Sequence, residues 1–481
     1  MALSARTANK PTPRTSKRSA INRWLLGVAL VVVGLVLCGC PGPATPESSR
    51  PPKADKWYRR AAQEFRVADI DAAHDSVRQA LDLVPGDEQV RLLAAQVALA
   101  RLEHAEVVRL LRGMQSGPAR GLLGRAYWYD GKLALAAEQF QAMLADPDVV
   151  DPWAKSVVKL ALEGDGRTPF AISGGLLAQV DLPRLGPGMP LFIVPVEIDG
   201  DDALALISTG NAEVVLDSAT RREPSWISIR FGKRLEVRDV PALTQDLSGV
   251  SGQLGVPIKA LLGSNLLRRL NVTLDHRGRQ FVARSFVPPP PPVASRVDLY
   301  YLRGGGMLMG TTLGAEASER AALFIDSAAS HSVTLDREGW QKIGIDVETL
   351  PIAPDDPAKK LRAGSIPLLR FGVFELPRVP AVYGTPFERL EQELDIDVDG
   401  VIGAGLLSDF RLTLSDAGRV LWIEQNVALP SLRSPAPSLS SPMLGPGESP
   451  APALPPASPP TGTGPVLGPV PPSESGGGSD R

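Results

Sequence analysis

An internal repeat constrains the fold of this 481-residue chain more than any other feature. Four landmarks occur in the same order in two stretches, at residues 206–210, 230–232, 240–242 and 261–263, and again at 324–328, 370–372, 379–381 and 401–403. From the fourth landmark the two stretches align without a gap up to Arg284 and Glu424. Four ordered matches are hard to obtain by chance, so we infer a duplicated unit. Short β-branched runs between Gly, Asp and Pro turns predict that this unit is built of β-strands.

Composition divides the chain around the repeat. The two halves are expected at residues 167–287 and 297–426, joined by a Pro-rich linker at 288–296 that contains five consecutive prolines. Residues 427–481 are rich in Pro, Ser and Gly and carry few large apolar side chains, so they cannot bury enough surface to fold. We therefore expect a disordered C-terminal tail.

The N-terminus has the pattern of a targeting signal. A basic, Ser/Thr-rich stretch precedes an apolar run over residues 24–37, which is short for a membrane span but typical of a signal-peptide core. The sequence Leu-Cys-Gly-Cys at 37–40 resembles a bacterial lipobox, which implies a signal peptide over 1–40 and lipidation of Cys40. Residues 41–55 then read as a polar tether. We expect a lipid-anchored protein of the bacterial cell envelope, facing the periplasm or the cell surface; an uncleaved N-terminal anchor is the alternative.

The composition argues against several kinds of partner. A formal net charge of −2 predicts no attraction to polyanions, so no nucleic-acid partner is expected. The two cysteines, Cys38 and Cys40, both lie in the targeting segment, which leaves no disulfide framework or cysteine metal site for the folded part. The four histidines are widely scattered, so neither a metal cluster nor a cofactor is predicted.

Residues 56–165 have a helical pattern rich in Ala, Leu and Arg, broken near Pro85, Pro118 and Pro147. Helix-turn-helix units at this spacing are typical of helical repeats. The segment resembles tetratricopeptide repeats at two sets of positions: Trp57, Ala61, Ala73, Val77, Ala80 and Pro85, and then Leu123, Gly124, Tyr127, Gly131, Ala136 and Phe140. The resemblance implies stacked helical hairpins; an ordinary helical hairpin bundle is the alternative.

A second resemblance lies in the repeat itself. The sequence Phe-Ile-Asp-Ser-Ala-Ala-Ser at 324–330 is similar to the Asp-Thr-Gly-Ala-Ser active-site motif of retropepsin-like aspartic proteases, and 401–407 resembles that family's downstream hydrophobic-hydrophobic-Gly element. In the family each half supplies one aspartate at the pseudo-two-fold axis, so tandem halves over roughly 167–426 imply an intramolecular version of the dimer. The predicted fold is therefore multidomain: α-helical tetratricopeptide-type hairpins, then an all-β, duplicated aspartic-protease-like barrel.

The first half departs from the family motif. Asp326 is the candidate catalytic aspartate, whereas Ser208 is its degenerate counterpart and cannot share a proton with it. Thr209 and Ser327 keep the hydroxyl groups that, as the resemblance implies, brace the two loops across the axis. The architecture of the motif is therefore expected to persist without its chemistry.

Two further differences point to lost catalysis. The third motif position, where backbone amides approach the carboxylates, is Gly210 in the first half but Ala328 in the second. In the family a flap covers the substrate from the interval after the motif. This interval is only half as long in the first half (208–230) as in the second (326–370), where 354–364 is the flap candidate.

These observations predict a binding protein whose helical repeats and catalytically degenerate module hold peptide or protein partners, with the membrane as a further partner through the lipid anchor. The alternatives are an active aspartic endopeptidase that uses Asp326, and a β module that serves only as a platform for the helices. Ser208 has no histidine or lysine base suggested near it that would make it a nucleophile. His331 is expected in an exposed turn, and Asp217 and Asp336 are expected to cap turns.

Overall fold

The computed structural model describes residues 50–184, 189–316, 318–354, 359–385, 391 and 396–425. The predicted signal peptide, the lipidation candidate Cys40, most of the tether and the predicted tail at 427–481 lie outside these residues. Within them, no helix is both long enough and apolar enough to cross a membrane. The first helix starts at Pro52, inside the predicted tether. Proline is well tolerated in the first turn of a helix, so this start is compatible with the sequence.

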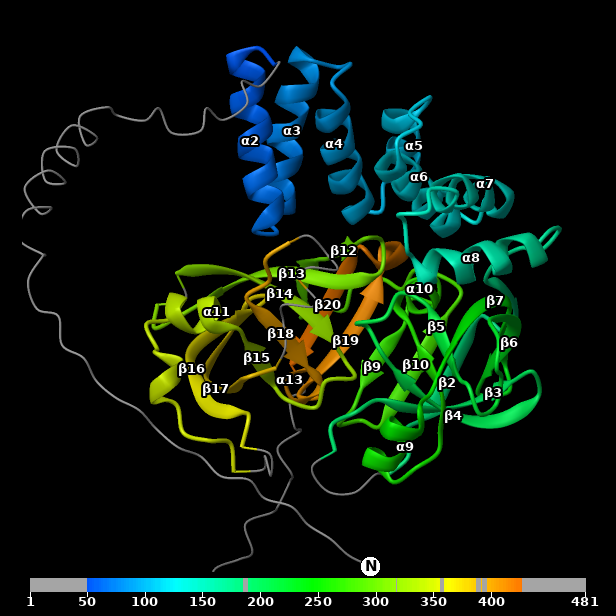
Figure 1. Ribbon diagram of the computed structural model, residues 1–481. Helices are drawn as coiled ribbons and strands as arrows, with labels where there is room; N and C mark the ends of the chain where they lie inside the picture. Colours follow the sequence, from blue (N-terminus) through cyan, green and yellow to red (C-terminus); the bar gives the residue numbers. More distant parts are fainter. Residues whose placement is uncertain are drawn as a thin grey trace, which may run out of the picture. The chain divides into compact units, whose positions relative to one another are not determined.

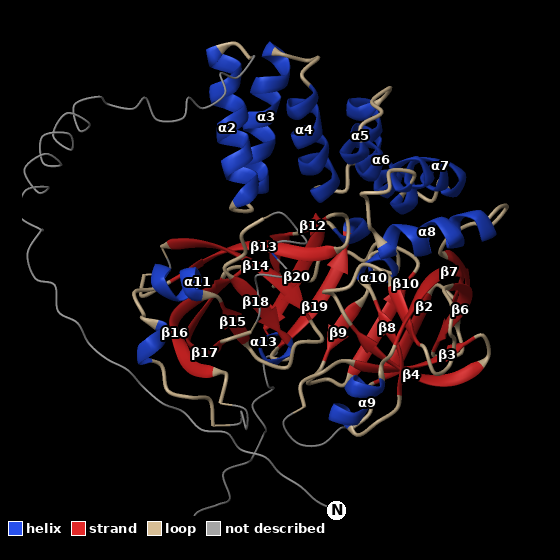
Figure 2. Cartoon of the chain, viewed as in Figure 1, coloured by secondary structure: helices blue, strands red, loops and turns tan. Residues whose placement is uncertain are grey.

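Seven α-helices come first in the described part of the chain (Figures 1 and 2). They are α2 (Pro52–Arg66), α3 (Ile70–Leu83), α4 (Glu88–Ala100), α5 (His104–Leu111), α6 (Gly117–Tyr129), α7 (Leu133–Leu144) and α8 (Pro152–Glu163). Asp69, Asp87 and Asp151 accept hydrogen bonds from backbone N–H groups in the first turns of α3, α4 and α8, donors that a helix start leaves free. Consecutive helices pack against each other, so the predicted helical region is confirmed.

Small residues set the distance between paired helices. Ala61, Ala73 and Ala136 are completely buried where helices meet. At Gly124, a Cβ atom would lie 2.7 Å from Cε1 of Phe140, so glycine is what lets α6 approach α7 this closely. These contacts account for the spacing of small residues along the chain. The assignment of the hairpins to the tetratricopeptide family stays a prediction.

The β-rich region contains two sheets with the same strand connections. The first half holds β3 (Ile193–Ile198), β4 (Asp201–Ile207), β5 (Val214–Asp217), β6 (Ser225–Phe231), β7 (Leu235–Gln245) and β8 (Ile258–Leu262), with β1 (Ala171–Gly174) added beside β7. The second half holds β13 (Gly306–Leu313), β14 (Glu319–Asp326), β15 (Val333–Leu335), β16 (Arg362–Phe371), β17 (Phe374–Tyr383) and β18 (Gly400–Gly403), with β12 (Tyr300–Leu302) added beside β13. In the first half β4, which leads into the motif, lies parallel to β8, and β8 also pairs antiparallel with β5. In the second half β14, β18 and β15 pair in the same way. The predicted duplication of a β fold resembling the aspartic-protease half is confirmed.

A third sheet is shared by the two halves. Its order is β11-β20-β19-β9-β10-β2, made of β2 (Leu177–Asp181), β9 (Thr273–Asp275) and β10 (Gln280–Arg284) from the first half and β11 (Ser295–Asp298), β19 (Phe410–Ser415) and β20 (Val420–Gln425) from the second. The halves meet where β9 pairs antiparallel with β19, and the Oγ1 atoms of Thr273 and Thr413 lie 2.9 Å apart. These threonines are equivalent in the repeat, so the pseudo-two-fold axis passes between them. Because β11 begins at Ser295, the linker predicted for 288–296 is two residues too long.

The helices share a core with the β-rich region. The described residues form one compact unit, completed by α9 (Ser248–Leu254), α10 (Ser264–Leu267), α11 (Arg337–Lys342), α13 (Ala404–Leu407) and the 3₁₀ turns η1 (Val347–Thr349) and η2 (Asp416–Gly418). Leu302, Leu308 and Phe324 of β12–β14 join the apolar core of the helices. Figure 1 shows the helices beside these strands. The helices therefore need the β surface to bury one of their faces.

Candidate functional site

The two motif loops meet at the ends of β4 and β14. Thr209 donates from Oγ1 to the carbonyl oxygen of Ile325 (2.8 Å), and Ser327 donates from Oγ to that of Ile207 (2.8 Å). In return, the backbone N–H of Ser327 donates to Thr209 Oγ1 (2.9 Å), and the backbone N–H of Thr209 donates to Ser327 Oγ (3.2 Å). Both side chains are buried. Each loop is therefore held by a hydroxyl group of the other half.

Glycines bring the downstream elements against the motif loops. A Cβ atom at Gly263, after β8, would lie 2.2 Å from the carbonyl oxygen of Glu213, and one at Gly403, after β18, would lie 2.2 Å from that of His331. No side chain fits at such distances, which explains why both copies of the repeat keep glycine here. His331 is half-buried in this contact, so its predicted exposure was wrong.

Asp326 places its carboxylate against the first half. Its Oδ1 accepts a hydrogen bond from the N–H of Ala328 (2.9 Å), and the backbone N–H of Gly210 is a second donor. A Cβ atom at Gly210 would lie 2.8 Å from Cγ of Asp326, so a larger residue would displace the carboxylate. Burial raises the pKa of Asp326, and the two backbone donors oppose this shift without cancelling it. The raised pKa therefore comes from burial rather than from a neighbouring carboxylate.

Ser208 stands in the place of the second aspartate and is almost completely buried (1% exposed). Its Oγ accepts a hydrogen bond from Nδ2 of Asn211 (2.7 Å) in the same loop. In the repeat, Asn211 corresponds to Ala329 of the second half, and the family motif also has alanine at this position. Sequence reasoning missed Asn211, although a polar residue at this small-residue position was the available signal. In the described part of the chain, no histidine or lysine hydrogen-bonds to Ser208.

The remaining polar candidates hold turns. Asp336 caps α11 by accepting the N–H of Gly339 (2.6 Å), and Asp217 accepts the N–H of Ala219 (3.3 Å), as predicted. Burial raises the pKa of Asp336 to about 6, and the charge of nearby Asp399 adds to the shift. Among the described residues, no group of three or more His, Cys, Asp or Glu side chains could hold a metal ion.

The flap interval differs between the halves. Residues 218–224 connect β5 to β6, whereas 336–361 separate β15 from β16 and include α11 and η1. The segment predicted as a flap, 354–364, is described only in part, because 355–358 lie outside the described residues. Its last residues, 362–364, pair with β17 as part of β16.

A cavity of about 660 Å³ borders the second motif loop. It is lined there by Ser330 and Gly405, and by residues of the first half that include Leu191. Neither Asp326 nor Ser208 lines it. The candidate carboxylate is therefore not part of the wall of this cavity.

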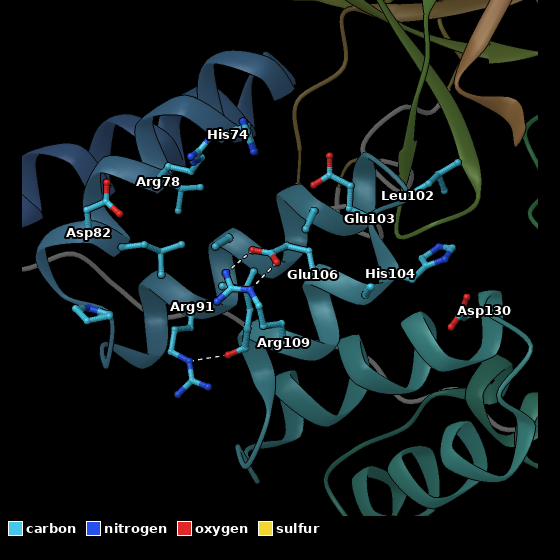
Figure 3. A pocket seen from close by; sticks show the side chains of 17 residues that line it. His74, Arg78, Asp82, Arg91, Leu102, Glu103, His104, Glu106, Arg109 and Asp130 are labelled. Atoms are coloured by element: carbon cyan, nitrogen blue, oxygen red, sulfur yellow. Dashed lines mark hydrogen bonds and ion pairs between the residues drawn. The ribbon is translucent and has the colours of Figure 1, made fainter. Parts of the chain in front are cut away.

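A larger groove of about 1040 Å³ lies in the helical region, between α3, α4 and α5 (Figure 3). Its apolar lining includes Val77, Leu81, Ala94, Ala98 and Leu110, and its charged lining includes Arg78, Asp82, Arg91, Glu103, Glu106 and Arg109. Arg109 donates two hydrogen bonds to Glu106 (2.7 and 2.5 Å), and Arg91 donates to the carbonyl oxygen of Leu110 (2.6 Å), as the dashed lines in Figure 3 show. The sequence did not single out these residues, because only the packing of three helices brings them together. We name this surface the helical groove.

Comparisons with known proteins give little beyond this geometry. No protein-family model matches the chain, and no curated protein matches it. Among solved structures, the chain is similar to a retropepsin-like aspartic protease from Rickettsia conorii, with 17% sequence identity and a TM-score of 0.21 over 27% of this chain and 90% of that one. At that TM-score the similarity has no weight of its own, and the fold rests on the strand pairings and the contacts between the motif loops.

Proposed function

We propose that this chain is a membrane-anchored binding protein of the bacterial cell envelope. In this proposal the helical groove holds a peptide or protein segment, and the aspartic-protease-like module no longer catalyses. The observation that supports it most is the hydrogen bond from Asn211 to Ser208 beside the loop of Asp326. An amide and a hydroxyl group occupy the place where proteolysis needs a second carboxylate.

Asp326 alone cannot perform the reaction of the family. That reaction uses two carboxylates that share one proton, so that one takes a proton from water while the other donates to the substrate carbonyl. Burial raises the pKa of Asp326 and disfavours its charged form, the only form able to act as a base. The hydroxyl group of Ser208 cannot take the missing role, because a neutral alcohol does not ionise near neutral pH. The module therefore keeps the framework of a protease and lacks its acid–base pair.

The helical groove has the properties of a peptide-binding surface. An apolar floor between charged edges suits a segment that buries apolar side chains and pairs its own charges at the rim. Arg78 makes no hydrogen bond or ion pair within the described part of the chain, so its guanidinium can bind a carboxylate of a partner. Glu106 and Arg109 are already paired with each other at the edge of the groove.

Attachment to the membrane through Cys40 completes the proposal. A bacterial lipoprotein cysteine carries several acyl chains, and each buried CH₂ contributes about 0.8 kcal/mol, so one modified cysteine suffices as an anchor. Cys40→Ser should move the protein from the membrane fraction to the soluble fraction. Retention in the membrane fraction would instead favour the uncleaved N-terminal anchor.

The absence of catalysis is tested with the purified protein and an unfolded protein substrate from acidic to neutral pH. We expect no cleavage above the buffer blank, and the same result for Asp326→Ala. Cleavage by the unmodified protein that Asp326→Ala abolishes would overturn the proposal and establish the endopeptidase alternative.

Binding in the helical groove is tested by selecting peptides from a displayed library and measuring the Kd of the best of them. Arg78→Glu reverses a charge inside the groove and should weaken binding about tenfold, the effect of one lost charged hydrogen bond. Arg60→Glu is the matched control, because Arg60 is an exposed arginine of α2 that does not line the groove. Equal Kd values for both variants and the unmodified protein would contradict binding at this surface.

A further inference from the structure

A smaller cavity, of about 140 Å³, lies where α5 and α6 approach α10 and η2. Arg268, Arg269 and Arg419 line it together with His104, Tyr129 and Asp130. The volume is several times the roughly 10–15 Å³ that one water molecule needs, so a small polyatomic ion fits. Three guanidinium groups around one small cavity make it a strongly basic place in a chain of nearly neutral composition.

Arg268 is the unusual member of this group. Only 5% of it is exposed, and within the described part of the chain its side chain forms no hydrogen bond or ion pair. Its Nε atom in particular is buried without a partner. The ring of Tyr129 lies 5.6 Å from its guanidinium carbon, a contact that only partly replaces lost hydration. Burial lowers the pKa of Arg268 to about 10, so the group is still charged at neutral pH. A buried, unpaired charge is costly, and proteins normally offset it with an anion.

The other charged groups around the cavity do not supply that anion. Asp130, the one carboxylate among the described lining residues, is paired with Lys132 (2.7 Å). Arg419 is balanced by Asp416, which accepts from its Nε and Nη2 (3.2 and 3.0 Å). With both ion pairs counted as neutral, Arg268 and Arg269 remain as two positive charges without an ion-pair partner among the described residues. Arg269 does donate from Nη2 to the carbonyl oxygen of Tyr129 (2.9 Å), and the charge of Asp130 acts on it.

Nearby groups are also committed elsewhere or lack partners. The carboxylate of Glu213 acts on Arg268 by its charge, which favours a higher pKa of Arg268. Its two oxygens, however, accept hydrogen bonds from Trp128 and Asn265 and none from Arg268. Nε2 of His104 is buried without a partner. Burial, followed by the charge of Arg268, lowers the pKa of His104 to about 4, so this imidazole is neutral at pH 7 and can offer an N–H donor.

We propose that this cavity is a binding site for a phosphate group, held by Arg268, Arg269, Arg419 and His104. A phosphate dianion matches the two positive charges of Arg268 and Arg269, and its oxygens accept from the forked donors of guanidinium groups. The group is either free phosphate or the phosphate of a small monoester. The described lining contains no residue of the motif loops. Leu102, His104 and Asp130 also line the helical groove, whereas Arg268, Arg269 and Arg419 do not.

The test is isothermal titration of the full-length protein with inorganic phosphate and with glycerol 3-phosphate, at constant ionic strength and neutral pH. We expect saturable binding of one phosphate group per chain. Tighter binding of the monoester would identify a phosphorylated small molecule as the source, and tighter binding of inorganic phosphate would identify the free ion. Acetate serves as the carboxylate arm and should bind at least about tenfold more weakly, because it carries one charge instead of two.

Substitutions connect the binding to the cavity. Arg268→Gln removes the buried charge and should weaken phosphate binding about tenfold or more. If Arg268→Gln does not fold, as judged by circular dichroism, Arg419→Gln takes its place, because about half of that side chain is exposed. Arg370→Gln is the control, an arginine of β16 paired with Glu375 and outside the lining. Absence of saturable binding to the unmodified protein, equal affinity for acetate, or loss of binding in the control as well would overturn the proposal.

Discussion

The hydroxyl groups of Thr209 and Ser327 each make two hydrogen bonds across the pseudo-two-fold axis, as donor to a carbonyl and as acceptor from an N–H. These bonds are independent of the residue that precedes each hydroxyl, which is Ser208 in one loop and Asp326 in the other. At the scale of single residues, the contacts that hold the loops are therefore separate from the groups that would catalyse. The geometry of the two loops therefore does not require an aspartate at the position of Ser208.

Thr209→Val should destabilise the protein by roughly 2–4 kcal/mol. The change removes two hydrogen bonds and leaves the carbonyl of Ile325 and the N–H of Ser327 buried without partners. Urea denaturation followed by circular dichroism measures the free energy of unfolding. Thr244→Val is the control, because the hydroxyl of Thr244 makes only a weaker hydrogen bond to the Arg222 carbonyl (3.4 Å) at the surface. The free energy of unfolding is expected to change by no more than about 0.5 kcal/mol in this variant. Equal effects of the two substitutions would show that the motif hydroxyls do not hold the halves together.

Asp336 gives the stability a pH dependence. Its pKa is raised from 3.8 to about 6 in the folded protein, so between these values the folded state binds more protons than the unfolded state. Stability should therefore fall as pH rises through this window. Asp336→Asn keeps a capping oxygen for Gly339 but cannot titrate, and it should be more stable than the unmodified protein at neutral pH by roughly 1 kcal/mol, after allowance for partial exposure. Urea titrations at several pH values measure the difference, and parallel profiles of the two proteins would refute the assignment.

At the scale of elements, α6 is joined to the first motif loop by a buried polar contact. Trp128 of α6 donates from Nε1 to Oε1 of Glu213 (3.1 Å), and Asn265 of α10 approaches the other carboxylate oxygen (3.4 Å). Burial raises the pKa of Glu213. Because Glu213 follows the motif loop directly, the helical region supports the loop from one side and α10 supports it from another.

Trp128→Phe should cost roughly 1–3 kcal/mol, since it leaves a buried carboxyl oxygen without its donor. Trp226→Phe is the matched control in the same interface. Trp226 is only partly buried and donates to the carbonyl of Leu160 (2.9 Å), which water can reach when the indole is lost. We expect thermal unfolding to show the larger decrease in Tm for Trp128→Phe, and the reverse order would contradict a structural role for Glu213.

The sequence predicted those parts of the fold that depend on local patterns. The repeat located the motif strands β4 and β14, the glycines after β8 and β18, and the hydroxyls at 209 and 327, because each recurs at a fixed place in both halves. It missed the contact between Asn211 and Ser208, and the contact between Trp128 and Glu213, because these depend on how a loop folds back and how a helix docks. The basic cavity was missed for the same reason: Arg268, His104 and Arg419 come together only in the folded chain.

At the scale of the whole molecule, the halves are joined by more than the Pro-rich linker. The third sheet, which the two halves share, takes three strands from each half. Its middle pairing, between β9 and β19, contains the hydrogen bond between Thr273 and Thr413. A half separated from the other would expose an unpaired edge of β9 or β19 as well as the motif loop. Since exposed edges favour aggregation, neither half is expected to be a stable domain alone.

Separate production of the two parts tests this dependence. A fragment of residues 50–287 should aggregate or unfold without a cooperative transition, because both the partner strand of β9 and the partners of Thr209 are missing. Co-production with residues 293–425 should restore a soluble complex, since the pairing between β9 and β19 and the bonds between the motif loops do not require a continuous chain. A protease site placed within 288–292 of the full-length protein provides the control, and cleavage there should leave the two pieces associated on size-exclusion chromatography. If fragment 50–287 unfolded cooperatively by itself with a Tm close to that of the full-length protein, the shared sheet would not be what stabilises the halves.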